Sequence, residues 1–133
     1  MKRIALIEKG ADGRYGIFTP DLESTIVGDG ASVREAKADF ENSLHEILQA
    51  YKDADEALPE ELNDIEFEYK FDIASLFDYF DFINVSKFAK RAGINPGLMR
   101  QYKSCGTYIS EKQAHKIEIA LKEIGAELSA ISL

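Results

Sequence analysis

The sequence predicts an α+β protein with two domains. Residues 1–70 are expected to form a small antiparallel sheet with one long helix, and residues 71–133 an all-α helix-turn-helix domain. Three observations predict this fold class: short apolar runs broken by glycine turns, one long helical stripe, and a pair of short amphipathic helices late in the chain. Each element follows from its own residue pattern.

Three strands are expected in the first thirty residues. Residues 2–9 contain an apolar run typical of a strand buried on both faces, and an Asp-Gly turn connects it to a second strand at residues 15–19. A Pro-Asp pair ends that second strand. Residues 24–27 are expected to form the third strand, and residues 28–30, with the sequence Gly-Asp-Gly, a loop.

A long helix is expected to begin after Ser32. Ser32 and Glu35 have the spacing of a capping box, in which each side chain accepts a backbone N–H at the helix start. Apolar residues then repeat at steps of three and four, and we expect them to face the sheet. These residues are Ala36, Phe40, Leu44, Ile47, Leu48 and Tyr51. The helix should end near Asp53, before an acidic turn region that contains proline.

A fourth strand and a short helix are expected on either side of the domain boundary. Residues 65–71 alternate apolar and charged side chains, as a strand with one buried face does, and this strand should return to the same sheet. Asp72 is placed to cap the helix that follows it. We therefore put the boundary between Lys70 and Asp72.

The stretch Asn84–Tyr108 predicts a helix-turn-helix motif. An apolar stripe predicts the first helix, and Gly93 should end it, with Ile94 buried under the turn. Asn95 is a good N-cap for the second helix, and Pro96 occupies the first helical position, where proline is tolerated best. The expected inner residues are Val85, Phe88, Ala89 and Ala92 in the first helix and Leu98, Met99 and Tyr102 in the second.

A last helix is expected after this motif. Ser110 and Gln113 form a second capping pair, and a further helical stripe continues to Gly125. The stripe consists of Ala114, Ile117, Leu121 and Ile124. Residues 127–133 are expected to form either another helical turn or a tail.

Charge separates the two predicted domains. The chain of 133 residues has a net charge of −8, but residues 1–70 hold 8 Lys/Arg against 17 Asp/Glu, a net of −9. Residues 84–122 hold 8 Lys/Arg against 2 Asp/Glu, a net of +6. A basic segment attached to an acidic one indicates two modules with different partners, and only the basic module suits phosphate groups.

The composition indicates a cytoplasmic protein without a cofactor. No apolar run is long enough for a transmembrane helix or a signal peptide. Cys105 is the only cysteine, which excludes an internal disulfide and suits a reducing compartment. No glycine loop has phosphate-binding spacing, so no cofactor is expected. His45, His115 and Cys105 are interpreted as surface or structural residues rather than catalytic ones.

The second helix of a helix-turn-helix motif lies in the major groove of DNA. Arg100 and Gln101 are the candidates for base contacts, because arginine pairs well with guanine and glutamine with adenine. Other residues would contact phosphates or line the outer surface of the motif. They are Asn84, Lys87, Lys90, Arg91, Asn95, Gly97, Lys103 and Ser104. The spacing leaves open a second interpretation, a helical hairpin whose lysines are only solvated.

The carboxylates of the acidic half leave a metal-dependent nuclease as a further alternative. Asp12, Asp21, Asp29 and Glu35 are the acidic residues that such a site would use. Their expected positions in turns, between glycines and at a helix cap give no sign of convergence on one ion. No metal site and no catalytic residue is therefore predicted.

The first half of the chain resembles the HicB antitoxin family of bacterial toxin–antitoxin systems. The run IALIEKGADGRYGIFTPDLESTIVGDGASVREAKADFENSLHEIL has that family's order of strand, Asp-Gly turn, Tyr-containing strand, Pro-Asp-Leu break, Gly-Asp loop and long helix. The second half is similar to phage-repressor-type (XRE-like) helix-turn-helix domains, through the run FAKRAGIN and through Gln101. Pro96, Gly97 and Cys105 depart from the pattern of those domains.

This resemblance implies a partial ribonuclease-H-like fold, without the carboxylate site of the enzyme, for residues 1–70. It implies a HicA-like mRNA-cleaving toxin as the partner of that domain and double-stranded operator DNA as the partner of residues 71–133. A homodimer or higher homo-oligomer is expected, because one small helix-turn-helix makes few operator contacts.

The leading hypothesis is thus the antitoxin of a type II toxin–antitoxin system that neutralises its toxin and represses its own operon. The alternative is a stand-alone helix-turn-helix transcription regulator whose acidic domain dimerises or senses a ligand.

Overall fold

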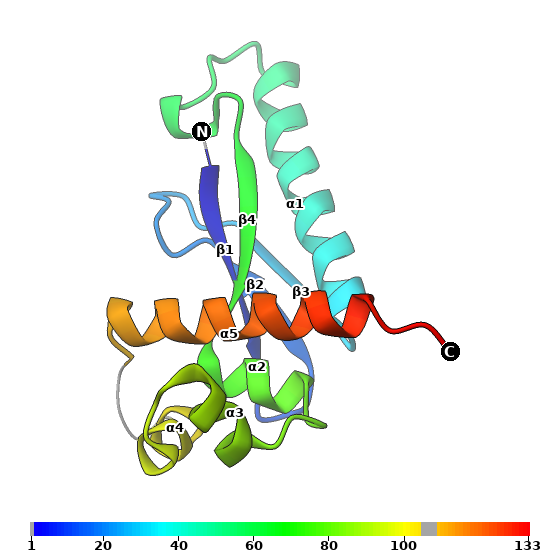
Figure 1. Ribbon diagram of the computed structural model, residues 1–133. Helices are drawn as coiled ribbons and strands as arrows, with labels where there is room; N and C mark the ends of the chain where they lie inside the picture. Colours follow the sequence, from blue (N-terminus) through cyan, green and yellow to red (C-terminus); the bar gives the residue numbers. More distant parts are fainter. Residues whose placement is uncertain (1, 105–108) are drawn as a thin grey trace. The chain divides into compact units, whose positions relative to one another are not determined.

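A computed structural model describes residues 2–104 and 109–133 (Figure 1). The chain divides into two compact units, Met1–Ser75 and Leu76–Leu133. The first unit holds β1 (Lys2–Lys9), β2 (Tyr15–Phe18), β3 (Val27–Gly30), α1 (Val33–Asp53), the short 3-10 helix η1 (Glu60–Leu62) and β4 (Glu66–Phe71). The second holds most of α2 (Ile73–Tyr79), then α3 (Val85–Ala92), α4 (Pro96–Lys103) and α5 (Glu111–Ser129). The fold is α+β, with a four-stranded sheet and a long helix followed by a helical region.

The sheet of the first unit has the strand order β3-β2-β1-β4 and is mixed. β1 pairs antiparallel with β2, and β2 with β3, but β4 pairs parallel with β1 in the register Lys2↔Glu66 to Ile7↔Phe71. The predicted antiparallel sheet is therefore wrong for its fourth strand. Parallel neighbours need a long crossover connection, and α1 with the segment after it provides one.

The third strand lies later in the chain than predicted. β3 is Val27–Gly30, so the Gly-Asp-Gly segment expected to be a loop is a strand, while most of residues 24–27 precede it. A Cβ atom added at Gly28 would lie 2.5 Å from the Cβ of Phe40, and one at Gly30 2.5 Å from the backbone nitrogen of Ala36. Because these glycines have no side chain, α1 can approach the strand closely. In the sequence alone, the same glycines look like a turn signal.

Helix α1 is anchored at its start and packs along one face of the sheet (Figure 1). The Ser32 hydroxyl accepts the Glu35 N–H at 3.1 Å, and the Glu35 carboxylate accepts the Ala31 N–H at 3.0 Å. Phe40 is fully buried and makes an edge-to-face contact with Phe67 at 4.9 Å between ring centroids. The capping pair, the helix and its end at Asp53 are confirmed.

Only one face of β1 is fully buried. Ala5 and Ile7 on the side of α1 have no exposed surface, whereas Ile4 and Leu6 on the other side are partly buried. The expectation that this strand is buried on both faces is therefore met on one face only. The reason is that the first unit supplies one long helix, which can cover one side of the sheet.

The division between the units falls inside α2. The Asp72 carboxylate accepts the Ser75 N–H at 2.7 Å, as expected of a helix cap, and the Ser75 hydroxyl accepts the Lys9 N–H at 2.7 Å. The start of α2 thus belongs with β1, and the compact units separate slightly later than the boundary placed between Lys70 and Asp72.

The second unit packs α3 against both α4 and α5. Its buried apolar residues are Leu76, Phe77, Phe88, Ala89, Ile94, Met99, Tyr102, Ile117 and Ala120. Phe77 and Phe88 meet edge to face at 5.6 Å between ring centroids. Helix α5 continues through Gly125 to Ser129, so of the two alternatives left open for residues 127–133 the further helical turn is confirmed as far as Ser129. A single glycine costs a helix only about 1 kcal/mol and does not by itself end it.

Among the described residues, no helix has the length and apolar character needed to cross a membrane.

Candidate nucleic-acid interface

Helix α3 begins and ends on side-chain and backbone caps. The Asn84 Oδ1 accepts the Lys87 N–H at 3.0 Å at the helix start. At the other end Gly93 has a φ of 75°, the left-handed conformation that glycine adopts without strain. The Ile94 N–H then donates to the Ala89 carbonyl at 2.9 Å, and the Ile94 side chain is 3% exposed. The turn and the burial of Ile94 are as the sequence predicts.

Helix α4 starts on a second asparagine cap. The Asn95 Oδ1 accepts the N–H groups of Gly97 at 2.8 Å and of Leu98 at 3.3 Å, and Pro96 takes the first helical position. Met99 and Tyr102 are buried. The predicted outer residues of this helix are Gly97, Arg100, Gln101, Lys103 and Ser104. The last four are exposed, whereas Gly97 is partly buried.

Arg100 is held in place by a neighbouring helix. Its Nη1 donates a hydrogen bond to the Ser86 Oγ of α3 at 3.1 Å. A Cβ atom added at Gly97 would lie 3.8 Å from the Arg100 Nη2 and 3.1 Å from the Asn95 Oδ1. The Cβ atom would thus be in ordinary contact with the guanidinium and close only to the Asn95 oxygen, and the hydrogen bond to Ser86 is the contact that orients Arg100.

The sequence prediction did not include Ser86. It lies 14 residues before Arg100, and only the packing of α3 on α4 brings the two side chains together. The available signal was a small hydroxyl residue in the first turn of α3, next to the apolar stripe.

The lysines of the interface differ from Arg91 in their surroundings. Lys87, Lys90 and Lys103 are exposed, whereas Arg91 forms an ion pair with Glu127 of α5. Lys116, also on α5, places its Nζ 3.5 Å from the Gly93 carbonyl oxygen at the end of α3. The predicted phosphate contacts are thus gathered on α3 and α4, and α5 adds a cation beside the turn.

Because both asparagines cap helices, the ways in which they can bind a ligand are limited. The Oδ1 atoms of Asn84 and Asn95 accept backbone N–H groups, and their amide nitrogens are the donors that these side chains can offer to a ligand. A donor is what a phosphate oxygen requires. Of the other residues weighed from the sequence, His45 and His115 are exposed, and Cys105 lies outside the described residues.

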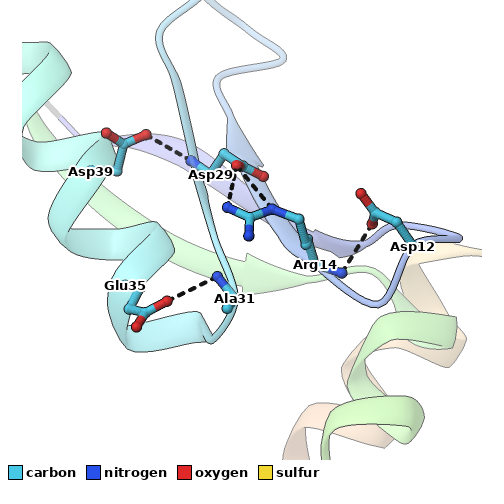
Figure 2. A network of polar contacts seen from close by, with 6 residues as sticks. All are labelled: Asp12, Arg14, Asp29, Ala31, Glu35 and Asp39. Carbon is cyan, nitrogen blue, oxygen red and sulfur yellow. Dashed lines mark hydrogen bonds and ion pairs between the residues drawn. The ribbon is translucent and has the colours of Figure 1, made fainter.

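Three of the four acidic residues considered for a nuclease site, Asp12, Asp29 and Glu35, accept hydrogen bonds within the first unit (Figure 2), and Asp21 is exposed. Asp29 accepts from the Arg14 Nη2 at 2.7 Å, Asp12 accepts the Arg14 N–H at 3.0 Å, and the Asp29 N–H donates to Asp39 at 2.9 Å. Glu35 is used by the α1 cap. Among residues 2–104 and 109–133, no three His, Cys, Asp or Glu side chains form a group that could hold a metal ion.

The charged groups of this network hold a loop together rather than form a reactive site. The hydrogen bond to Asp29 and its negative charge raise the pKa of the Arg14 guanidinium, so the arginine stays charged. Elsewhere in the same unit, burial and the charge of Asp72 raise the pKa of Glu8.

No protein-family model, curated protein or solved structure matches this chain.

Proposed function

We propose that this protein is an antitoxin of a type II toxin–antitoxin system that also represses transcription of its own operon. Its N-terminal unit binds and masks a HicA-like mRNA-cleaving toxin. Its C-terminal unit is a helix-turn-helix domain that binds double-stranded operator DNA as a homodimer or higher homo-oligomer. The proposal assigns no catalytic activity, metal or cofactor to the chain.

The observation that carries the proposal is the α3–α4 pair. Two capped helices joined by a left-handed glycine turn bury Ile94, Met99 and Tyr102 inward and leave the polar residues of α4 outward. The guanidinium of Arg100 donates a hydrogen bond to Ser86 of α3, which orients it on the outer side of the helix pair. A positioned arginine beside an exposed glutamine suits contacts with base edges, and exposed lysines suit phosphates.

The toxin-binding half of the proposal is supported by charge and by the sheet. Residues 1–70 carry a net charge of −9, which complements a basic ribonuclease and favours encounter with it. A four-stranded sheet backed by a single long helix supports the partial ribonuclease-H-like fold that the HicB resemblance implies. When this acidic surface covers the toxin's RNA-binding surface, it also hinders RNA from reaching the toxin.

DNA binding is tested by titrating a labelled duplex from the region upstream of this gene with the full chain at several salt concentrations. We expect Lys90→Ala and Lys103→Ala each to weaken binding and to reduce the slope of log affinity against log salt by about 1. The matched control is Lys52→Ala, in the last turn of α1 in the acidic unit. An equal effect of all three substitutions, or no salt dependence, would contradict the proposed interface.

Toxin binding is tested by expressing the reading frame beside this gene with and without the protein. We expect the neighbour alone to stop growth and to cleave mRNA, and co-expression to restore growth and yield a complex of the two proteins. A harmless neighbour that does not co-purify would remove the toxin half and leave the DNA half standing. Metal-stimulated RNA cleavage by the purified protein, lost in Asp29→Asn, would instead favour a nuclease.

A second candidate is a stand-alone regulator whose acidic unit senses a ligand. That unit contains a hollow of about 450 Å³ lined by Arg3, Glu23, Ser24, Pro59, Glu60 and Glu61. A small effector bound there would change DNA affinity without any protein partner. The neighbouring gene separates the two candidates, because the regulator needs no toxin beside it.

A further inference from the structure

The two arginines of the α3–α4 pair are held by partners of different charge. Arg91 forms an ion pair with Glu127, so a carboxylate offsets its charge. The Arg100 Nη1 donates instead to the neutral Ser86 Oγ at 3.1 Å, and among residues 2–104 and 109–133 no ion pair joins Arg100 to a carboxylate. Arg100 is therefore oriented by a partner that leaves its positive charge uncompensated.

The packing of α3 on α4 determines where the acceptor of this hydrogen bond lies. Each helix turns a residue without exposed surface to the core, Ala89 in α3 and Met99 in α4. Ser86 is in the first turn of α3 and is partly buried, whereas Arg100 of α4 is exposed. A serine side chain is short, so its oxygen stays close to the helix that carries it. The position of α3 thus sets the direction of the guanidinium.

A guanidinium held in this way still has donors for a base. It carries five N–H groups and no acceptor, and Ser86 uses one of the five. In the major groove guanine presents two acceptors, O6 and N7, whereas adenine presents the N7 acceptor beside an amino donor. An oriented pair of donors therefore distinguishes guanine from adenine. An arginine that turns away to a phosphate reads nothing, because phosphates are the same at every base pair.

The orientation also reduces the cost of binding. A long side chain that becomes ordered in a complex loses rotamer freedom, and this loss weakens the complex. Arg100 has given up part of that freedom before DNA arrives, because Ser86 already restrains it.

We propose that Ser86 is a positioning residue that determines specificity: it holds Arg100 so that α4 reads one guanine in each half of the operator. This inference rests on the proposed function, because it requires that α4 enters the major groove of DNA. It adds a residue of α3 to the base-reading set and names the base pair that the pair of residues selects.

The test titrates the full chain with labelled duplexes from the region upstream of the gene, in which each guanine is replaced in turn by 7-deazaguanine. This base pairs normally but lacks the N7 acceptor. We expect wild type to lose affinity about fivefold or more at one guanine in each half of the site. Arg100→Ala should show no loss at that position.

Ser86→Ala should bind the unmodified duplex about two- to tenfold more weakly, the effect of ordering one long side chain. Its loss at the selected guanine should shrink, and its salt dependence should stay that of wild type, because no phosphate contact is removed. In the Arg100→Ala background, adding Ser86→Ala should cost nothing further. Ser86→Thr keeps the hydroxyl and should restore both affinity and guanine dependence.

The matched control is Ser129→Ala, at the exposed last residue of α5, which should bind as wild type does. Alanine forms helices at least as well as serine, so Ser86→Ala should fold, and circular dichroism checks this.

Two results would overturn the inference alone. One is Ser86→Ala with the affinity and guanine dependence of wild type. The other is a loss in Ser86→Ala that persists undiminished in the Arg100→Ala background, because Ser86 would then act through a contact of its own. A wild type that binds no upstream duplex would remove the proposed DNA binding and this inference together, so the two failures are observed separately.

Discussion

The acidic and basic halves of the chain use their charged side chains in different ways. In the first unit, Asp29 and Asp39 accept hydrogen bonds from Arg14 and from the backbone, and they hold β3 near the start of α1 (Figure 2). In the second unit, Asn84 and Asn95 satisfy the helix ends, and the lysines of α3 and α4 stay exposed.

The hydrogen-bond partners of a charged side chain separate a structural role from a role in binding another molecule. A carboxylate that accepts a backbone N–H fixes the local chain and is a poor candidate for chemistry. A cation on a helix whose ends are already capped by neutral amides is not needed to fix the local chain. Substitutions of single residues in the two halves test this contrast.

The largest expected effect is in the core of the acidic unit. Phe40→Ala removes a fully buried ring that contacts Phe67 and Tyr69, and we expect it to lower the free energy of unfolding by about 3–5 kcal/mol. Chemical denaturation followed by circular dichroism measures the loss. Phe40→Leu should cost less, and a loss below about 1 kcal/mol for Phe40→Ala would contradict the packing of α1 on the sheet.

A smaller effect is expected from the cap of α4. Asn95→Ala leaves the Gly97 and Leu98 N–H groups without their acceptor and should destabilise the basic unit by about 1 kcal/mol. Asn95→Ser keeps an acceptor and serves as the control. If thermal unfolding shows equal losses for both substitutions, the side chain matters for a reason other than capping.

A pH-dependent effect is expected from Tyr69. Burial, together with the charge of Glu41 and a hydrogen bond to it, raises the pKa of this phenol to about 12. The pKa of Tyr69 in the folded protein lies above the usual value near 10. The protonated phenol therefore contributes to stability fully below pH 10, and this contribution is lost as the pH rises through 12. An ultraviolet titration should show one of the six tyrosines ionising last, and that phase should be missing in Tyr69→Phe. A retained late phase would assign it to another tyrosine.

The smallest effect is expected from the ion pair on the surface of the acidic unit. Arg14 and Asp29 have side chains that are 48% and 63% exposed, so solvent screens their attraction. Asp29→Asn should leave the melting temperature unchanged within error. A fall of several degrees would mean that this network stabilises the unit far more than its exposure suggests.

The sequence predicted those parts of the fold that depend on nearby residues. The capping pair of Ser32 and Glu35, the glycine turn after α3 and the Asn95 cap each require residues only a few positions apart. The parallel pairing of β4 with β1 depends on residues that are distant in the chain, and no local pattern specifies it. The strand β3 was misplaced because its glycines serve helix packing, which only the position of α1 reveals.

The same limit applies to the candidate interface. The exposure of Arg100 and Gln101 followed from the helical period, because Met99 and Tyr102 occupy the inner face. The hydrogen bond from Arg100 to Ser86, and the ion pair of Arg91 with Glu127, join different helices and needed the packed structure. Sequence patterns therefore indicated which residues face outward but not how they are held.

The central claim is that α4 contacts bases in DNA through Arg100 and Gln101. The most direct measurement compares wild type, Arg100→Ala and Gln101→Ala on a labelled duplex from the upstream region and on a scrambled duplex of the same length. We predict that each substitution costs about 1–3 kcal/mol on the upstream duplex and much less on the scrambled one, so that specificity falls. Equal affinity of all three proteins for the upstream duplex would contradict the claim.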